Sequence, residues 1–339
     1  MAEKVTAQMV AERAGVSQSA VSRVFTPGAS VSARTEKKVR EAASALGYRP
    51  NVLARAMVSG RSRMIGLVVA YLENQFYPEV LEKLSNALQA EGYHILVFMA
   101  SQEAGTLDTV VEEILDYQVE GIVLASVSLS SDLASRCQAA GVPVVLFNRS
   151  QDIDGISAVT SDNFTGAFQV GQFLLAGEHE RIAYLAGWEG ASTQRDRQRG
   201  FVAALDVAGR RLHAWEDGRF EPSRTADAVR IMFDRSSRPD AVFVAGDQMA
   251  LIAMDVLRHE LGLSVPGDVS VVGFDDVPAA SWLSYRLTTV RQQADLMVAR
   301  CVSTLLRAIE TPGAAPERHA IEAPLILRAS ARIPQGWTQ

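Results

Sequence analysis

A run of hydrogen-bonding side chains near the N-terminus has the composition of a surface that contacts nucleic acid. Val21 and Val24 are three residues apart, so on a helix that starts after Ser17 both would face a core. The side chains left on the outer face are Gln18, Ser19, Ser22 and Arg23. Amide, hydroxyl and guanidinium groups suit hydrogen bonding to base edges and phosphates, so this helix is a candidate DNA contact.

The charge distribution agrees with such a contact. Residues 1–63 contain eleven Lys or Arg and four Asp or Glu, a net charge of +7. The whole chain contains 33 and 39, so the remaining residues carry 22 against 35, a net charge of −13. A basic segment on an acidic body indicates that nucleic acid is bound at one end of the chain.

A second set of polar and aromatic residues directly follows short apolar runs in the acidic body. Ligands of open α/β sheets bind beyond the carboxyl ends of the strands, so residues there are candidate ligand contacts. They are Phe76, Tyr77, Asn148, Arg149, Ser161, Asp162, Asp247, Asp275 and Asp276. For each acidic member the alternative is that it caps the next helix. Their common position at one edge favours a binding site.

Three short helices must position the first set of residues. Thr6 and Ser17 are expected to cap the first two helices, and Gly15 to end the first one with a positive φ. A third helix is expected between Ser32 and Gly47. The alternative is a generic three-helix bundle with a solvated basic face.

Residues 51–59 are expected to form a further short helix, which Asn51 can cap after Pro50. A helix of this length is not stable alone. It suits a segment that folds only against DNA or a second copy of the chain. The alternative is a plain interdomain linker.

The rest of the chain alternates strand-like apolar runs with amphipathic helices. Strands are expected at 64–70, 94–99, 121–125, 142–147, 181–186, 241–245 and 270–274. Helices are expected at 78–91, 106–117, 131–140, 163–176, 194–208 and 247–261. This alternation is typical of parallel sheets with helices on both faces, here in two units that divide near Val159.

The sequence offers no coherent enzyme, metal or cofactor site. The five histidines have no metal-ligand spacing, and no Walker, GxSxG or GxGxxG motif is placed for catalysis. Asp275 and Asp276 are adjacent, so their side chains should point apart rather than act as an acid–base pair. Cys137 and Cys301 have no CxxC partner, which favours reduced, buried thiols in a cytoplasmic protein. Neither a signal peptide nor an apolar run of roughly 20 residues for a membrane span is present.

Three N-terminal motifs carry a family resemblance. They are VTAQMVAERAGVSQSAVSRVF, VSARTEKKVREAASALGYRPN and LARAMVSGRSRMIGLVV. The chain resembles the LacI/GalR family of bacterial transcription regulators over essentially its whole length. The resemblance implies an all-α helix-turn-helix headpiece, a hinge helix and a two-lobed, periplasmic-binding-protein-like α/β core, over residues 1–49, 50–61 and 62–339. Lobe 1 would comprise about 62–160 and 291–320, and lobe 2 about 161–290 and 321–332.

The resemblance also implies which residues contact DNA. Helix 18–26 would be the recognition helix in the major groove, and helix 51–59 would pair with a second copy in the minor groove. The expected DNA contacts are Thr6, Ser17, Gln18, Ser19, Ser22, Arg23, Ser32, Asn51, Ala54 and Met57. Met57 stands where the family usually has a leucine that wedges into the central base step, and methionine is similarly long and apolar.

For the core, the resemblance implies a carbohydrate-type site. Arg197 would point into the cleft, Asp275 would accept ligand hydroxyls, and Phe220 would stack on a sugar ring. The expected ligand contacts are Phe76, Asn148, Ser161, Asp162, Thr193, Arg197, Phe220, Asp247, Asp275 and Gln292. The chain departs from the family pattern at Asn148, Trp188 and Gly246, where aspartate, a small residue or proline, and asparagine are common.

These features predict a sequence-specific transcriptional regulator that a small molecule controls allosterically, and not an enzyme. We expect a repressor; the alternative is an activator, because the sign of regulation depends on where the operator lies. A homodimer on a palindromic operator is expected, since one head makes few base contacts. After Arg332 only residues 333–339 remain, too few for a heptad-bearing tail. The alternatives are a solute-binding transport receptor, which would have no use for residues 1–60, and a sugar-processing enzyme, for which no nucleophile–base pair appears.

Overall fold

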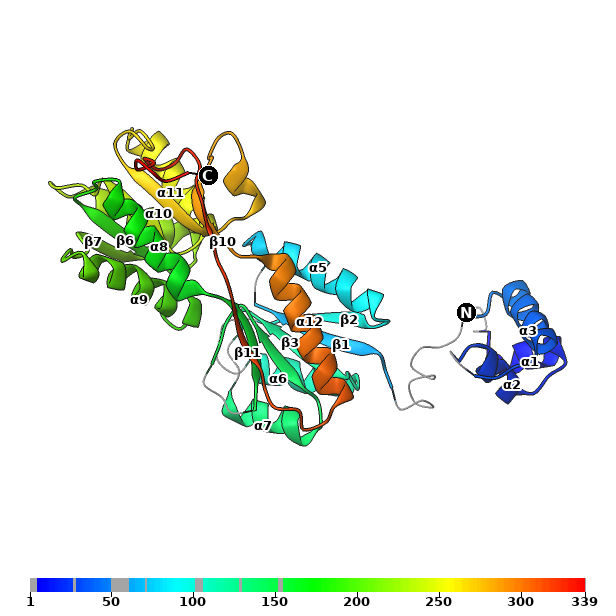
Figure 1. The fold of residues 1–339 in the computed structure, drawn as a ribbon. Coiled ribbons are helices and arrows are strands. Elements are labelled where there is room, and N and C mark those ends of the chain that lie inside the picture. The colour runs from blue at the N-terminus through cyan, green and yellow to red at the C-terminus, as the bar shows by residue number, and fades with distance from the viewer. Residues whose placement is uncertain are drawn as a thin grey trace. The chain divides into compact units, whose positions relative to one another are not determined.

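The computed structural model describes residues 5–26, 29–49, 61–70, 72–100, 106–127, 130–151 and 155–338. Contacts divide the chain into two compact units, Met1–Arg63 and Met64–Gln339, which we call the head and the core. Figure 1 shows the helices of the head and the strands and helices of the core.

The head contains α1 (Ala7–Ala14), α2 (Gln18–Val24) and α3 (Ala33–Leu46). The predicted caps are confirmed: Thr6, Ser17 and Ser32 each accept the backbone amide three residues further along the chain. Gly15 and Gly47 end α1 and α3 with φ of 66° and 69°, conformations that glycine adopts without steric cost. These local signals therefore set the helix boundaries.

One valine from each helix forms the centre of the head. Val10, Val21 and Val39 are fully buried, which fixes the face that each helix turns inward. Helix α2 ends at Val24, two residues before the predicted end, and the ring of Phe25 then lies 5.8 Å from that of Tyr48. The predicted helix at 51–59 lies outside the described residues.

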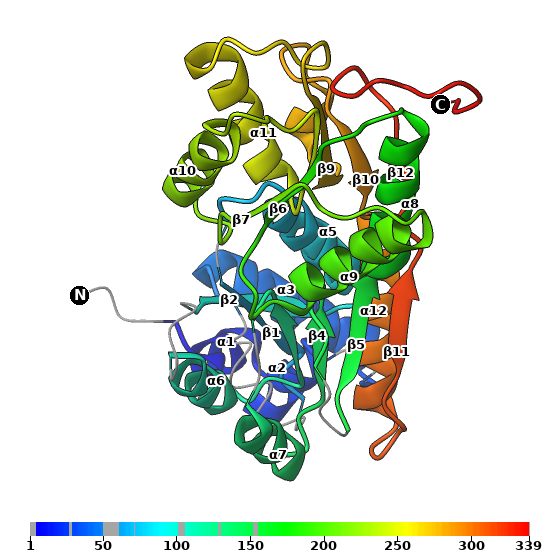
Figure 2. The same cartoon turned by 90° about the vertical axis from the view of Figure 1, so that its left-hand side faces the viewer.

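Lobe 1 of the core is built on a six-stranded parallel sheet. Its strands are β1 (Met64–Val69), β2 (His94–Met99), β3 (Gly121–Ala125), β4 (Val144–Phe147), β5 (Ser157–Ser161) and β11 (Arg318–Ile321). Their order is β11-β5-β4-β3-β1-β2 (Figure 2). Helices α5 (Phe76–Ala90) and α12 (Ala294–Glu310) pack together on one face. The other face is covered by α6 (Thr106–Asp116) and α7 (Ser131–Ala139).

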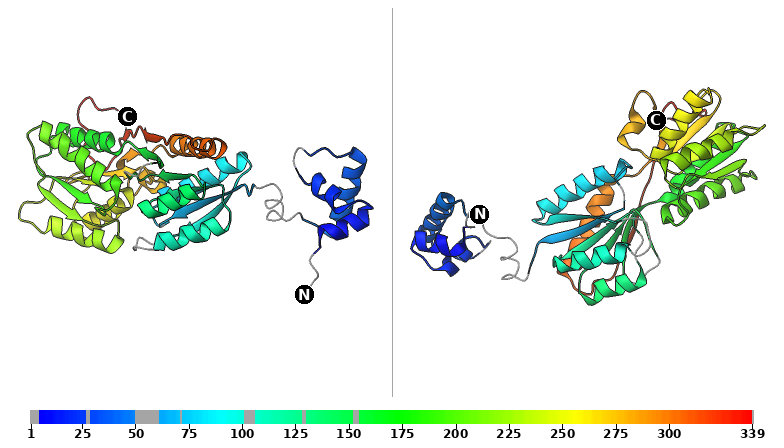
Figure 3. Two further views of the ribbon diagram at one scale, coloured as in Figure 1. Left: turned by 90° about the horizontal axis from the view of Figure 1, so that it is seen from below. Right: turned by 180° about the vertical axis from the view of Figure 1, so that it is seen from behind.

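Lobe 2 is built on a second six-stranded sheet. Its strands are β6 (Ile182–Ala186), β7 (Ala214–Asp217), β8 (Ala241–Val244), β9 (Ser270–Asp275), β10 (Thr288–Arg291) and β12 (Leu325–Ile326). Their order is β12-β10-β9-β8-β6-β7, and only the β10–β12 pairing is antiparallel. Helices α8 (Asn163–Ala176) and α9 (Ser192–Val207) cover one face, and α10 (Pro222–Phe233) and α11 (Asp247–Asp255) cover the other (Figure 3).

The chain passes between the lobes three times. The crossings follow β5, β10 and β11, so that α12 and β11 complete lobe 1 and β12 returns to lobe 2. This confirms the predicted class of two parallel-rich α/β lobes. The predicted helix 247–261 differs, because α11 continues from Val256 to Glu260 as one π-helical turn.

Candidate functional site

The carboxylate of Asp275, at the end of β9, joins the two lobes. Its Oδ1 accepts a 2.7 Å hydrogen bond from the Gln292 side-chain amide and lies 3.3 Å from the guanidinium of Arg197. Its Oδ2 accepts a 3.1 Å hydrogen bond from Asn74, which belongs to lobe 1. All four side chains are buried. A single buried carboxylate thus collects donors from both sides of the interlobe boundary.

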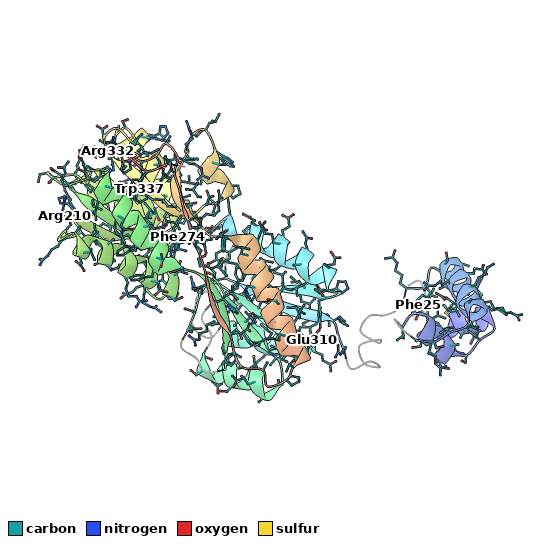
Figure 4. All side chains as sticks on the ribbon, in the orientation of Figure 1. Phe25, Arg210, Phe274, Glu310, Arg332 and Trp337 are labelled. Atoms are coloured by element: carbon teal, nitrogen blue, oxygen red, sulfur yellow. The ribbon has the colours of Figure 1, made fainter. Side chains whose placement is uncertain are left out.

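The guanidinium of Arg197, from α9, is held on three further sides. Its Nε donates a 2.9 Å hydrogen bond to Asn163 Oδ1, and a terminal nitrogen donates to the carbonyl of Ala245. Its Cζ lies 3.7 Å from the centroid of the Phe274 ring, which supplies a cation–π contact. Figure 4 places Phe274 in lobe 2 close to lobe 1. The charge therefore has a fixed position beside Asp275.

Asp247 lies behind Asp275 and is completely buried. Its Oδ1 accepts the Thr289 hydroxyl at 2.6 Å and its Oδ2 accepts the Val277 amide at 3.0 Å. Burial, and then the nearby Asp275 carboxylate, raise the pKa of Asp247 to about 8. Burial also raises the pKa of Asp275, which the charge of Arg197 opposes. Residue 273 must be glycine here, because a Cβ would lie 2.2 Å from Asp247 Oδ1.

The raised pKa of Asp247 predicts that the stability of the protein depends on pH. The pKa of Asp247 rises from 3.8 to about 8 on folding, so between these values the folded state holds a proton that the unfolded state lacks. The free energy of unfolding should therefore fall as pH rises across this window, by up to about 1.4 kcal/mol per pH unit from this group. In the D247N variant the side chain at residue 247 keeps nearly the same size and shape but can no longer ionise. Urea unfolding of both proteins from pH 5 to 9 should show a difference that changes with pH; parallel profiles would contradict the assignment.

Several other predicted ligand residues meet at the same boundary. The Ser161 hydroxyl donates a 2.8 Å hydrogen bond to Gln292 Oε1, which orients the amide that binds Asp275. Phe76, buried at the start of α5, stacks on Phe147 with the ring centroids 6.5 Å apart. Thr193 is buried in the first turn of α9, one turn before Arg197.

Phe220 lies next to Asp275, and two glycines make room for its ring. A Cβ at Gly187 would lie 2.1 Å from the ring. A Cβ at Gly246 would lie 3.6 Å from the ring and 3.5 Å from Asp275 Oδ2. An asparagine side chain at residue 246 would therefore extend between the aromatic face and the carboxylate, a space that glycine leaves open.

Two of the acidic residues that follow predicted strands, Asp162 and Asp276, bind other groups of the protein. Asp162 accepts the Thr165 amide and caps α8, the alternative role considered for such residues. Asp276 forms 2.6 Å ion pairs with Arg291 and Arg328. The side chains of Asp275 and Asp276 thus point apart, as expected, although Asp276 pairs with arginines rather than capping a helix.

Two buried asparagines of the site were missed by the sequence analysis. Asn74 binds Asp275, and Asn163 binds Arg197. Asn74 lies in the same post-strand segment as Phe76, and Asn163 directly follows Asp162. The strand-end rule that selected Phe76 and Asp162 would have found both asparagines if it had been extended by one or two residues.

Four of the candidate DNA contacts lie on the outer face of one helix of the head. Gln18, Ser19, Ser22 and Arg23 are all exposed on α2. Thr6, Ser17 and Ser32 use their hydroxyls as helix caps, and Ser17 Oγ also lies 2.9 Å from Ser19 Oγ. The predicted contacts Asn51, Ala54 and Met57 lie outside the described residues. The role of the whole set in binding DNA stays a prediction.

The described residues show neither a metal centre nor a membrane segment. No group of three His, Cys, Asp or Glu side chains among them could hold a metal ion. Within the same residues no helix is long and apolar enough to cross a membrane. Cys137 and Cys301 are buried free thiols in α7 and α12, and burial raises the pKa of both.

Comparison with known proteins identifies both parts of the chain. Residues 6–51 match the family model of bacterial regulatory proteins of the lacI family. Residues 62–329 match the model of periplasmic binding proteins and the sugar binding domain of the LacI family. The transcriptional regulator CelR of Thermobifida fusca is 33% identical over 335 residues, covering 96% of this chain and 98% of the relative. The repressor PurR of Pasteurella multocida is 28% identical, with coverage of 96% and 98%.

Solved structures show the same architecture. A complex of the regulator CelR with cellobiose has a TM-score of 0.74 and 31% identity, covering 96% of this chain and 100% of that one. The lac repressor dimer bound to operator and the anti-inducer ONPF has a TM-score of 0.88 and 28% identity, covering 97% and 99%. With its helix-turn-helix head and its two-lobed effector-binding core, the chain belongs to the LacI family of DNA-binding bacterial transcriptional regulators.

Proposed function

We propose that the protein is a repressor whose affinity for a palindromic operator is controlled by a carbohydrate or carbohydrate derivative bound between the lobes. It acts on DNA in the cytoplasm and catalyses no reaction. The observation that carries this proposal is the buried Asp275 carboxylate, which collects donors from both lobes. Sugar hydroxyls can donate to the carboxylate, and the Phe220 face suits the C–H side of a sugar ring. The cellobiose complex of the similar regulator CelR supports the ligand class.

The proposed control follows from the hydrogen bonds that join the lobes. Besides the Asn74–Asp275 bond, the Ser150 amide donates to Ser192 Oγ at 3.0 Å, and the Ala279 amide donates to Gln75 Oε1 at 3.2 Å. A ligand that takes the place of Asn74 on Asp275 changes which arrangement of the lobes is favoured. Coupling of about 1–3 kcal/mol between ligand and operator is typical of such linkage and is reciprocal.

We propose that the lobes also form the dimer. The outer edge of lobe 1 exposes apolar side chains on β2, an edge strand that would otherwise be a site for unwanted pairing. A hollow beside it is lined by side chains from α5 and β2. Lobe 2 adds exposed apolar side chains next to the Gln75–Ala279 contact. The surface consists of Leu72, Val97, Met99, Trp282 and Leu283. Two copies paired there would present two heads to one palindrome.

The same proposal assigns roles along the sequence. Residues 1–49 bind DNA, 50–61 form the hinge, and 62–339 bind the effector and dimerise. The residues proposed to contact DNA are the ten that the family resemblance implies, Thr6, Ser17, Gln18, Ser19, Ser22, Arg23, Ser32, Asn51, Ala54 and Met57. Those proposed to contact the effector are Phe76, Asn148, Ser161, Asp162, Thr193, Arg197, Phe220, Asp247, Asp275 and Gln292.

Two substitutions should separate the two activities. Arg23→Ala removes an exposed donor from α2 and should weaken specific operator binding by about 1–3 kcal/mol, while effector binding is unchanged. Asp275→Asn should keep operator affinity and lose the response to effector. Operator DNA selected from a random library and a sugar found by thermal shift supply the reagents. Fluorescence anisotropy at fixed salt then measures operator affinity, since phosphate contacts make it salt-dependent. An intact effector response in Asp275→Asn would contradict the proposed site.

A further inference from the structure

Arg149, which directly follows Asn148 after β4, is a buried cation that lacks a counter-charge. Only 4% of its surface is exposed. Among the residues that the structure describes, its guanidinium has neither a hydrogen bond nor an ion pair. A buried, uncompensated charge costs several kcal/mol, so such a group is normally paired. Arg197, the other buried arginine at the boundary, is paired with Asp275.

A ring contact that positions this guanidinium comes from lobe 2. Its Cζ lies 5.4 Å from the centroid of the Trp188 ring. The ring itself is seated over Gly190, where a Cβ would lie 2.2 Å from it. Stacking on an indole face holds a guanidinium in place and leaves the N–H groups at its edge free to bind a planar anion. Trp188 therefore orients Arg149 without neutralising it.

Two further unpartnered polar atoms lie at the neighbouring strand ends. Ala125 and Phe147 are partners in the β3–β4 register, so Ser126 and Asn148 follow side by side. Both are buried, and within the described part of the chain neither Ser126 Oγ nor Asn148 Oδ1 has a hydrogen-bond partner. The other end of the Asn148 amide is engaged, because Nδ2 donates to Tyr77 Oη at 2.8 Å. Each buried polar atom left unpaired costs about 1–3 kcal/mol.

This group of side chains adjoins the Asp275 site. Ser150, the residue after Arg149, donates its amide to Ser192, which begins the helix that carries Arg197. Tyr77, the partner of Asn148, is next to Phe76. The two groups of side chains are therefore connected through α9 and α5, with the paired charges of Asp275 and Arg197 in one group and the unpaired charge of Arg149 in the other.

We propose that the effector carries an anionic group, a carboxylate or a phosphate, that binds Arg149. The Ser126 hydroxyl donates to the same group, and Asn148 Oδ1 accepts an adjoining hydroxyl of the ligand. Charge-assisted, bidentate hydrogen bonds of this kind are the strong ones in anion recognition. The inference rests on the proposed carbohydrate site and narrows its ligand from sugars in general to acidic sugar derivatives.

The test compares neutral and acidic forms of the same sugars on the full-length protein. Glucose, galactose and ribose are each tested as the free sugar, the sugar acid and the sugar phosphate, by thermal shift and then calorimetry. At least one acid or phosphate should bind, and at least about 10-fold more tightly than its neutral parent, as expected for hydrogen bonds to a charged group. Comparing the affinities of the sugar acids with those of the sugar phosphates shows whether a carboxylate or a phosphate is preferred. If no anionic member binds at 10 mM, or if a neutral parent binds as tightly as its acid and phosphate, the proposal is wrong.

Substitution of the arginine locates the effect. Arg149→Gln should weaken binding of the anionic ligand by about 10- to 100-fold, and Arg149→Lys by less, because the charge remains. The matched control is Arg199→Gln, which removes an exposed arginine of α9 whose guanidinium pairs with Asp196. It should leave binding unchanged. Equal effects of the two Gln variants would overturn the assignment, and circular dichroism checks that each variant is folded.

The Asp275→Asn variant distinguishes failure of this inference from failure of the proposed site. If Asp275→Asn loses binding of an anionic ligand that Arg149→Gln still binds as tightly as the parent protein does, the carbohydrate site stands and the anion subsite is wrong. If Asp275→Asn binds every compound as well as the parent protein does, the carbohydrate site itself is wrong.

Discussion

Replacement of Arg197 by methionine is expected to lower the free energy of unfolding by about 3–5 kcal/mol, the usual cost of removing one partner of a buried ion pair. Methionine is about as long as arginine but carries no charge, so it leaves the buried Asp275 carboxylate without its counter-charge. Asn163 Oδ1 and the Ala245 carbonyl also lose their donor. Response to effector should be lost with the same substitution.

Urea unfolding followed by tryptophan fluorescence measures the change. The exposed Arg199→Met, on the same helix, is the matched control and should change stability by about 0.5 kcal/mol or less. In the double variant Arg197→Met/Asp275→Asn the uncompensated charge is gone, so part of the lost stability should return. If the single variant were as stable as the parent, or the double variant no more stable than the single, the ion pair would not have the assigned role.

Gly200→Ala is the second substitution with a large expected effect. A Cβ at this position of α9 would lie 2.1 Å from the carbonyl oxygen of Phe164 and 2.9 Å from its carbonyl carbon. These atoms belong to the backbone of α8, so no side-chain rotation relieves the overlap and the two helices must separate. We expect a loss of about 3 kcal/mol, at the upper end for overpacking.

Gly246→Ala is the control for this prediction. Its Cβ would meet Asp275 and Phe220 at ordinary contact distances of 3.5 and 3.6 Å, and its φ of −166° is extended backbone. Thermal unfolding of the two variants should therefore give a much larger fall in Tm for Gly200→Ala. Similar Tm values would show that α8 and α9 are not packed as closely as described.

The sequence predicted the buried strands of the core because they are uniformly apolar. Strand β1, for example, is buried at all six positions. Strand β7 was missed since it lies at the sheet edge, reads Ala-Trp-Glu-Asp and exposes Trp215. The caps of the head were predicted because they depend on side chains within three residues. The edge strand β2 was nevertheless predicted, because it reads His-Ile-Leu-Val-Phe-Met. A strand is thus readable in a single sequence where it is an apolar run, and not where it is short and of mixed polarity.

The candidate site was also only partly predictable. Asp275 and Ser161 are the last residues of β9 and β5, and parallel topology brings such strand ends to one edge. The bond between Asn74 and Asp275 joins residues 201 positions apart on different lobes, and no local period encodes such a pairing. The sequence alone could not decide between helix capping and ligand binding for Asp162, because both roles need an acceptor at the same position.

The late return of the chain to lobe 1 affects how the protein is made on the ribosome. Strand β5 pairs with β11, and α5 packs against α12, so the lobe begun first is completed only when residues near Ile321 emerge. At synthesis rates of about 5–20 residues per second, the roughly 160 residues after Ser161 take about 10–30 s. During that interval one strand edge and one helix face of the nascent lobe stay uncovered. The growing chain should therefore need protection by a chaperone until its last fifty or so residues appear.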